Sequence, residues 1–234
     1  MGMRTSERGV AAGRNGSIAT PPATLLQVGR QPKELLSMPS PHPLVSRYRE
    51  DIQFQATVRG FDFRFTTTHG LFSPREVDEG SRLMLDYVEP AATARTLDVG
   101  CGYGILGMAL ARMAPQGMHT LIDKDYVAID YSKKNLAANG IKNAEVFLSN
   151  GLSDVGQRQF DLIVSNLPAK AGNELFYLYF YDALHHLAPG GELVVVTING
   201  LRDFVKRSFN EVFGNYEKRK QGARYTISAA VKNS

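Results

Sequence analysis

Hydrophobic and polar positions recur with two different periods along the chain, and the change of period divides it into elements. From Thr96 onward, short apolar or β-branched runs alternate with longer runs whose apolar residues recur every three or four positions. The short runs predict buried strands and the longer runs predict amphipathic helices. The predicted strands are 96–99, 119–122, 144–148, 160–165 and 192–198, and the predicted helices are 105–114, 126–139, 173–187 and 201–213.

This alternation of strand and helix predicts a parallel sheet covered by helices on both faces. Two more β-like runs end the chain, at 215–220 and 223–231, and the short link Gln221-Gly222 requires them to pair antiparallel. We therefore expect an α/β protein with a Rossmann-like, doubly wound, seven-stranded sheet that ends in an antiparallel hairpin. A dinucleotide-binding dehydrogenase would instead continue with another crossover helix.

The region before the sheet has a different pattern. Residues 50–67 alternate apolar and polar side chains and predict a small β-hairpin that turns at Arg59-Gly60. Residues 68–90 predict a polar, glycine-containing loop followed by a helix that begins near Ser81.

The N-terminal 40 residues are rich in Gly, Ala, Ser, Thr, Pro and Arg and show no sustained apolar period. This composition predicts a disordered tail, and it is also typical of an organelle transit peptide. We expect the folded domain to occupy residues 41–234, with the catalytic core at 95–232.

Composition and charge narrow the class of protein. Its 234 residues fit one α/β domain with extensions, and no apolar run approaches the roughly 20 residues that span a bilayer. We therefore expect no membrane contact, and a cytoplasmic protein unless the tail directs import. Residues 1–49 carry seven Lys/Arg and two Asp/Glu, which accounts for the net charge of +4. A nucleic-acid surface on the folded body must therefore be local.

Metal and disulfide chemistry are not expected. Cys101 is the single cysteine, which excludes an internal disulfide and a cysteine zinc cluster. The pair His185-His186 has no acid or third histidine at ligand spacing.

A glycine-rich loop follows the first strand of the predicted core, with glycine at positions 100, 102, 104 and 107. A strand, a glycine loop and a helix let the backbone approach a ligand, and the helix start offers free N–H groups. The spacing satisfies the dinucleotide fingerprint G-x-G-x-x-G. However, Asp98 is poorly placed against a pyrophosphate and suits a cofactor with an amine and a sulfonium. The stretch resembles motif I of class I S-adenosylmethionine (SAM) methyltransferases.

Polar residues follow the next strands, where ligands bind in open α/β sheets. Asp123 follows the second strand and can accept both hydroxyls of a ribose. Asn150 follows the third strand, where SAM enzymes commonly have an acid for the adenine amine; an ordinary turn is a comparable interpretation. Asn166 follows the fourth strand, and its amide with a backbone carbonyl can hold an exocyclic amine toward the methyl donor.

With these stretches the chain resembles the "small domain" family of methyltransferases, which includes ribosomal RNA guanine-N2 methyltransferases and archaeal single-domain relatives. The resemblance covers roughly residues 50–232 and rests on four stretches, 70–73 with 78–81, 98–104, 166–172 and 188–192. It implies SAM as cofactor. The candidate cofactor-binding residues are Asp98, Gly100, Cys101, Gly102, Tyr103, Gly104, Asp123, Lys124, Asn150, Gly151 and Asn166.

The chain departs from the family pattern after the fourth strand. The family has Asn-Pro-Pro followed by a bulky residue, whereas this chain has Leu167 for the first proline and Ala169 for the bulky residue. Phe72, close to Gly70, is our candidate for covering a planar substrate instead. The candidate catalytic residues are Asn166, Leu167 and Pro168, and the candidate substrate-binding residues are Phe72, Ser73, Ala169 and Lys170.

Three hypotheses of function follow. The favoured one is a SAM-dependent N-methyltransferase of an exocyclic amine, guanine N2, in ribosomal or other structured RNA. The alternative is a SAM enzyme that acts on a small molecule or a protein amide, as the near-neutral body and Ala169 suggest. A non-catalytic binding module is disfavoured by Asp98, Asp123 and Asn166. The sequence makes no prediction of oligomeric state.

Two basic clusters are candidate RNA contacts, residues 206–207 and residues 218–220 with Arg224. Charge runs of this kind are more often solvated surface.

Overall fold

The structure, a computed structural model, describes residues 42–233. The predicted tail, residues 1–40, lies outside the described residues. The helices are α1 (Pro43–Arg49), α2 (Glu79–Leu85), α3 (Ile105–Met113), α4 (Tyr126–Ala138), α5 (Asn173–His186) and α6 (Arg202–Phe213), with a short 3-10 helix η1 (Asn199–Leu201). The strands are β1 (Ile52–Val58), β2 (Phe61–Thr67), β3 (Thr96–Val99), β4 (His119–Asp123), β5 (Ala144–Leu148), β6 (Phe160–Asn166), β7 (Leu187–Ile198), β8 (Glu217–Gln221) and β9 (Tyr225–Val231).

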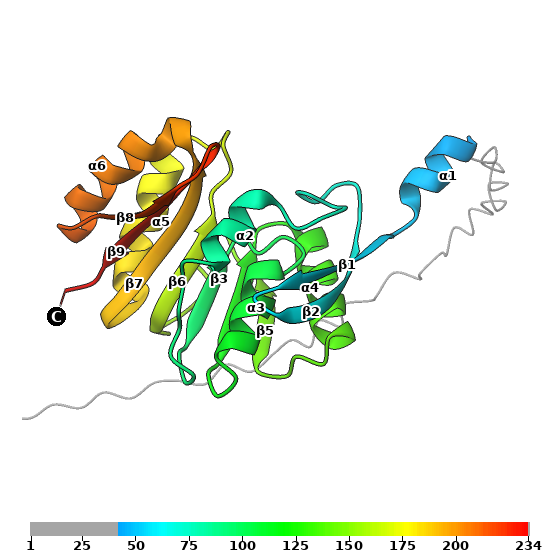
Figure 1. Cartoon of the computed structure of the whole chain (residues 1–234), viewed down its shortest axis with the longest axis horizontal. Helices are drawn as coiled ribbons and strands as arrows, with labels where there is room; N and C mark the ends of the chain where they lie inside the picture. The colour runs from blue at the N-terminus through cyan, green and yellow to red at the C-terminus, as the bar shows by residue number, and fades with distance from the viewer. Residues whose placement is uncertain (1–41, 234) are drawn as a thin grey trace, which may run out of the picture. The chain divides into compact units, whose positions relative to one another are not determined.

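A seven-stranded sheet has the order β5-β4-β3-β6-β7-β9-β8 and forms the centre of the fold (Figure 1). Neighbouring strands from β5 to β7 pair parallel, whereas β9 pairs antiparallel with both β7 and β8. The strand order reverses between β3 and β6, which is where open α/β sheets bind ligands. The predicted fold class, including the terminal antiparallel hairpin, is confirmed.

Two hydrophobic clusters cover the two faces of this sheet. One contains apolar residues of α2, α3 and α4 together with the β1–β2 hairpin, and the other contains apolar residues of α5 and α6. Side chains of a strand alternate between faces, so Leu97 and Val99 belong to the second cluster. Among the helices of residues 42–233, none has the length and apolar character needed to cross a membrane.

The start of β7 differs from the sequence prediction. Residues 188–191 have a turn-like composition, yet β7 begins at Leu187 and passes through them with a register shift against β6. Gly190 donates its backbone N–H to the Lys232 carbonyl (2.9 Å), and Lys232 donates to the Gly191 carbonyl (2.8 Å). A Cβ at Gly191 would lie 2.8 Å from the carbonyl oxygen of Phe160. The glycines therefore permit a close strand approach where the pattern predicts a loop.

The predicted N-terminal hairpin is confirmed, with β1 and β2 pairing from Ile52–Thr67 to Val58–Phe61. Its turn residues Arg59 and Gly60 both have positive φ, 52° and 78°, as a two-residue type I′ turn requires.

Two asparagines, one in α4 and one at its C-terminal cap, attach this hairpin to the core. The amide of Asn135, fully buried, accepts from Thr66 N (2.8 Å) and donates to Thr66 O (3.0 Å) and to the carbonyl of Tyr103 (2.9 Å). One helical turn later, Asn139 makes the same pair of bonds with Arg64 (2.9 and 2.7 Å). These side chains satisfy the backbone of β2 where no further strand pairs with it, and they connect the hairpin to the glycine loop.

Candidate active site

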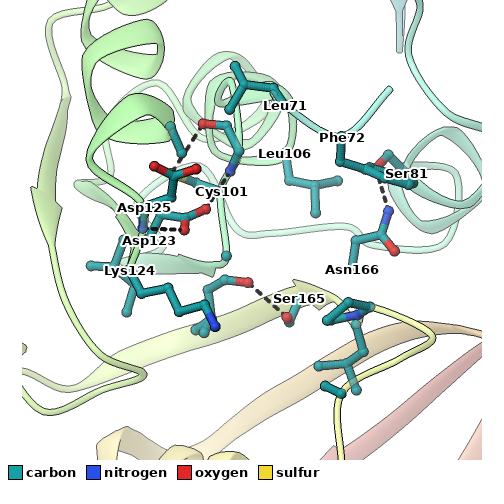
Figure 2. A pocket seen from close by; sticks show the side chains of 18 of the residues that line it. Leu71, Phe72, Ser81, Cys101, Leu106, Asp123, Lys124, Asp125, Ser165 and Asn166 are labelled. Atoms are coloured by element: carbon teal, nitrogen blue, oxygen red, sulfur yellow. Dashed lines mark hydrogen bonds between the residues drawn. The ribbon is translucent and has the colours of Figure 1, made fainter. Parts of the chain in front are cut away.

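A cavity of about 670 Å³ lies at the carboxyl ends of β3, β4 and β6. Figure 2 shows two groups of side chains at opposite ends of this cavity, with Ser165 between them. Asp123, Lys124 and Asp125 lie at one end, whereas Phe72, Ser81 and Asn166 lie at the other.

Most of the residues predicted for the site line this cavity. They are Phe72, Gly100, Cys101, Gly102, Tyr103, Asp123, Lys124, Gly151, Asn166, Leu167, Pro168, Ala169 and Lys170. Four predicted residues do not line it. Asp98 lies behind the glycine loop, Gly104 is the buried last residue of the loop before α3, Asn150 is exposed beside Gly151, and Ser73 lines a shallow neighbouring cavity.

The glycine loop takes a backbone course that requires glycine. Gly100, Gly102 and Gly104 have φ values of 76°, 56° and 97°, a region that side chains with a Cβ rarely adopt. Gly107 serves a different purpose, since a Cβ there would lie 2.3 Å from Leu121. Gly100 and Gly102 therefore shape the cavity wall, Gly104 completes the turn into α3, and Gly107 lets α3 approach the sheet.

Asp123 is fixed at one end of the cavity by two backbone donors. Gly102 N donates to its Oδ2 (3.0 Å) and Asp125 N donates to its Oδ1 (2.9 Å). Each carboxylate oxygen accepts more than one hydrogen bond, so both retain capacity for a ligand. Asp125 instead caps α4 by accepting from Val127 N (2.8 Å).

Asp98 has a position that the sequence did not predict. It is 1% exposed, and its Oδ2 accepts from Gly107 N (2.9 Å) at the start of α3. Its Oδ1 has no hydrogen-bond partner among residues 42–233. Burial raises the pKa of the carboxyl from 3.8 to about 7; the Gly107 N–H opposes this increase and the charge of Asp123 adds to it. Asp98 therefore supports the loop from behind and does not face the cavity.

Cys101 has the features of a packing residue. Its thiol is buried 3.5 Å from the Ser132 hydroxyl, and burial together with the charge of Asp98 raises the pKa of the thiol. A raised pKa disfavours the reactive thiolate.

Asn166 is held by two residues of the α2 segment. Its Nδ2 donates to both oxygens of the Asp78 carboxylate (3.2 and 3.3 Å) and to the Ser81 hydroxyl (3.0 Å; Figure 2). An ionised carboxylate only accepts hydrogen bonds, so the amide must present its NH₂ group to Asp78. The amide oxygen makes no hydrogen bond with residues 42–233, and Asn166 lines the cavity.

Asp78 also caps α2. Its Oδ1 accepts from Gly80 N (2.9 Å) and Ser81 N (3.2 Å), which explains why the helix begins at Glu79. Gly80 packs against Tyr225, since a Cβ there would lie 3.1 Å from the tyrosine ring. The sequence predicted a helix beginning near Ser81, but no local pattern indicated contact with a residue 88 positions away.

Phe72 lies on the loop before α2 and is 65% exposed, so it is not a core residue. The neighbouring Leu71 is buried and anchors the loop. Ser73 has a φ of 46°, unusual for a residue other than glycine, and its hydroxyl donates to the Glu76 carbonyl (2.8 Å). The Tyr103 hydroxyl donates to the same carbonyl (3.2 Å), which ties this loop to the glycine loop.

Tyr179 is a cavity residue that the sequence did not predict, because it comes from the middle of α5. A Cβ at Gly151 would lie 2.8 Å from its ring. Gly151 therefore packs directly against the ring of Tyr179, and a side chain at position 151 would clash with that ring.

Comparison with known proteins gives consistent results. Residues 62–229 match the family described as "Methyltransferase small domain". The Bacillus subtilis protein YbxB is 37% identical over 67% of this chain and 78% of its own length. Ribosomal RNA small subunit methyltransferase C of Hamiltonella defensa is 38% identical over 73% of this chain and 51% of its own length.

Among solved structures, a Thermus thermophilus enzyme has a TM-score of 0.72 at 28% identity, over 78% of this chain and 51% of that one. It is described as a 16S rRNA N2 G1207 methyltransferase (RsmC) in complex with AdoMet and guanosine. The chain thus spans about half the length of the ribosomal RNA methyltransferases that it matches.

The buried position of Asp98 predicts a pH dependence of stability. The pKa of its carboxyl is about 7 in the folded chain and 3.8 ordinarily. Between pH 3.8 and pH 7 the folded state therefore keeps a proton that the unfolded state has released. The resulting stabilisation of the fold is complete below pH 4 and is lost as pH rises through 7. The total loss is up to about 4 kcal/mol, since each unit of pKa difference corresponds to about 1.4 kcal/mol. Asp98→Asn cannot ionise and should lack this loss.

Urea unfolding of both proteins between about pH 5 and pH 8 measures the effect. The free energy of unfolding of the wild type should fall relative to that of the variant as pH rises. Parallel curves would contradict the assignment.

Proposed function

We propose, from the premise that the chain belongs to the methyltransferase small domain family, that it is a SAM-dependent N-methyltransferase of guanine N2 in ribosomal or other structured RNA. The observation that carries the proposal is the amide of Asn166, whose NH₂ group is held by Asp78 and Ser81. Its oxygen is left free to accept a hydrogen bond from an amine. The relatives named as ribosomal RNA methyltransferases support the substrate class.

The end of the cavity around Asp123 suits the cofactor. We assign both ribose hydroxyls to the carboxylate of Asp123, which retains accepting capacity beside Gly102. The adenine ring would lie between Ile122 and the Gly151 turn, with Tyr179 beside it. When bound, SAM supplies an electrophilic methyl group on a sulfonium.

The opposite end of the cavity suits an amine. Asn166 Oδ1 and the backbone carbonyl of Leu167 are two acceptors for the two N–H bonds of an exocyclic amino group, and Pro168 stiffens the segment that carries them. Accepting both N–H bonds directs the nitrogen lone pair away from the protein and toward the methyl donor. The contribution of these residues is therefore orientation at near-attack distance.

Phe72 is our candidate for the residue that holds the base flat. It lines the same cavity as Asn166 and is largely exposed, and an aromatic ring stacks on any base. Ala169 offers no ring at the position where the family has a bulky residue. Ala169 also favours the alternative, a small-molecule or protein-amide substrate. An RNA substrate agrees with a cytoplasmic enzyme, and import directed by residues 1–40 stays a prediction.

The first test concerns the cofactor. Asp123→Ala should weaken binding of S-adenosylhomocysteine by about 1.5–3 kcal/mol, the range for hydrogen bonds to a charged group. Calorimetry measures this, with Lys133→Ala on the exposed face of α4 as control. Binding of NADH in place of S-adenosylhomocysteine would refute the cofactor assignment.

The second test identifies the substrate and the role of Asn166. Wild-type protein with methyl-labelled SAM should transfer label to RNA and not to the protein or small-molecule fraction of a cell extract. Digestion should then give N2-methylguanosine. Asn166→Ala should lower kcat by about 100-fold, as loss of one preorganised polar partner does, while cofactor affinity stays nearly constant. Label in protein or small molecules alone would favour the alternative.

Asp78 provides a sharper form of this test. Asp78→Asn keeps an oxygen for the α2 cap but places an NH₂ group against the NH₂ of Asn166, so the amide should rotate and kcat should fall. Exchanging the pair, Asn166→Asp with Asp78→Asn, restores one donor facing one acceptor and should raise kcat above that of Asn166→Asp alone. Glu79→Gln is the control for charge. Absence of rescue in a protein that melts normally would exclude the orienting role.

The third test concerns Phe72. Phe72→Ala should raise the KM of the RNA substrate by roughly 10-fold, because base stacking is worth about 1–3 kcal/mol, and Phe72→Tyr should be tolerated. Melting and kinetics are measured on one preparation. A lowered melting temperature with an unchanged KM would mean that Phe72 only packs.

A further inference from the structure

Positive charge in the described chain is concentrated on one short segment. Residues 199–224 contain seven Lys/Arg and three Asp/Glu, whereas residues 42–198 contain 14 Lys/Arg and 18 Asp/Glu. The segment comprises η1, α6, β8 and the turn into β9, which gather at one end of the sheet (Figure 1). The rest of the body therefore repels a polyanion, and this end attracts one.

The charges on the β8–β9 hairpin are of two kinds. Arg219 is half-buried and forms ion pairs with Glu192 and Glu217, so its charge is compensated within the fold. Lys218, Lys220 and Arg224 are exposed and form no ion pair with residues 42–233. We call these three residues the hairpin cations.

Protection of the sheet edge explains only part of this pattern. Lysines on an edge strand discourage pairing with other chains, and β8 is an edge strand that carries Lys218 and Lys220. Arg224 lies in the turn and not on β8. Arg202 of α6 donates to Gln221 Oε1 (3.4 Å), but its charge is compensated by an ion pair with Asp203. The cationic surface thus extends beyond the strand that needs protection.

The turn that carries Arg224 is held in place beside the cavity. Asn199 donates its Nδ2 to the carbonyls of Gly222 (3.2 Å) and Ala223 (2.9 Å), and its backbone N–H to the carbonyl of Arg224 (2.9 Å). Asn199 directly follows Ile198, which lines the main cavity, the 670 Å³ cavity of the candidate active site. The turn therefore keeps a fixed position relative to the site.

Tyr225 connects the cations to the substrate end of the cavity. It lines the main cavity and also, with Arg224, the shallow neighbouring cavity. Phe72 and Asp78 are likewise common to both cavities. If the target base lay at Asn166, the adjacent nucleotides of the RNA chain would therefore lie over the β8–β9 hairpin.

We propose that the hairpin cations bind backbone phosphates of the nucleotides that flank the target base in RNA. This inference rests on the proposed function and assigns a surface to its substrate. Phosphate contacts position a nucleic acid while the pocket reads the base. An acidic protein partner would suit the same charges, but RNA is favoured because Arg224 lines the shallow cavity that shares Phe72, Asp78 and Tyr225 with the cavity that would hold the base.

The test uses the full chain and two triple variants with equal loss of charge. The first replaces the hairpin cations, Lys218→Gln, Lys220→Gln and Arg224→Gln. The control is Lys133→Gln, Lys134→Gln and Lys142→Gln, three exposed residues on or just after α4, toward the opposite edge of the sheet. The probe is a fluorescent stem–loop transcript of 16S ribosomal RNA, titrated by anisotropy at about 50–300 mM NaCl.

The hairpin variant should bind the transcript at least about 10-fold more weakly at low salt. Its slope of log K against log salt should be smaller by about 2–3, since each phosphate contact contributes roughly 0.7–0.9. The control should stay close to the wild type. Both variants should keep the melting temperature and S-adenosylhomocysteine affinity of the wild type.

Equal weakening in both variants would overturn the proposal, because the effect would then be net charge alone. An unchanged slope in the hairpin variant would also overturn it and leave an acidic protein as the partner to examine. A wild type that binds RNA through this surface but transfers no methyl group would refute the proposed function and support the surface.

Discussion

The hydrogen bonds from the Asn166 amide to Asp78 and Ser81 are the interaction on which the candidate site depends. A carboxamide has a donor end and an acceptor end of nearly equal shape, so position alone does not determine which end faces a ligand. The carboxylate of Asp78 settles the choice, since it accepts and cannot donate. The end of β6 supplies the amide, and a segment that precedes the sheet supplies its orientation.

That preceding segment forms one wall of the cavity and is connected to the core by buried polar contacts. Asn135 bonds the hairpin strand β2 and the carbonyl of Tyr103, and the Tyr103 hydroxyl bonds the carbonyl of Glu76. Buried groups of this kind are costly to leave unpaired. The β1–β2 hairpin, the glycine loop and the Phe72 loop are therefore connected to one another beside the cavity.

Local patterns were sufficient to predict the sheet, the terminal hairpin and the glycine loop, because period and turn chemistry are properties of neighbouring residues. They were insufficient for Asp78 and Tyr179, which reach the cavity through packing between distant segments. Asp98 shows a third case. Its place near the end of β3 was evident, but strand side chains alternate between faces, and Asp98 points toward α3, where Gly107 N donates a hydrogen bond to its Oδ2.

The double use of Asp78 has a consequence for the order of folding. The same carboxylate caps the N-terminus of α2 and accepts from the amide of Asn166. Formation of α2 and orientation of the Asn166 amide are therefore linked. A chain with a complete sheet but an unformed α2 would present its amide in either orientation. Such an intermediate could bind cofactor through the glycine loop without being able to align an amine. An aligned amide at the end of the sheet thus requires that the segment before the sheet has docked onto it.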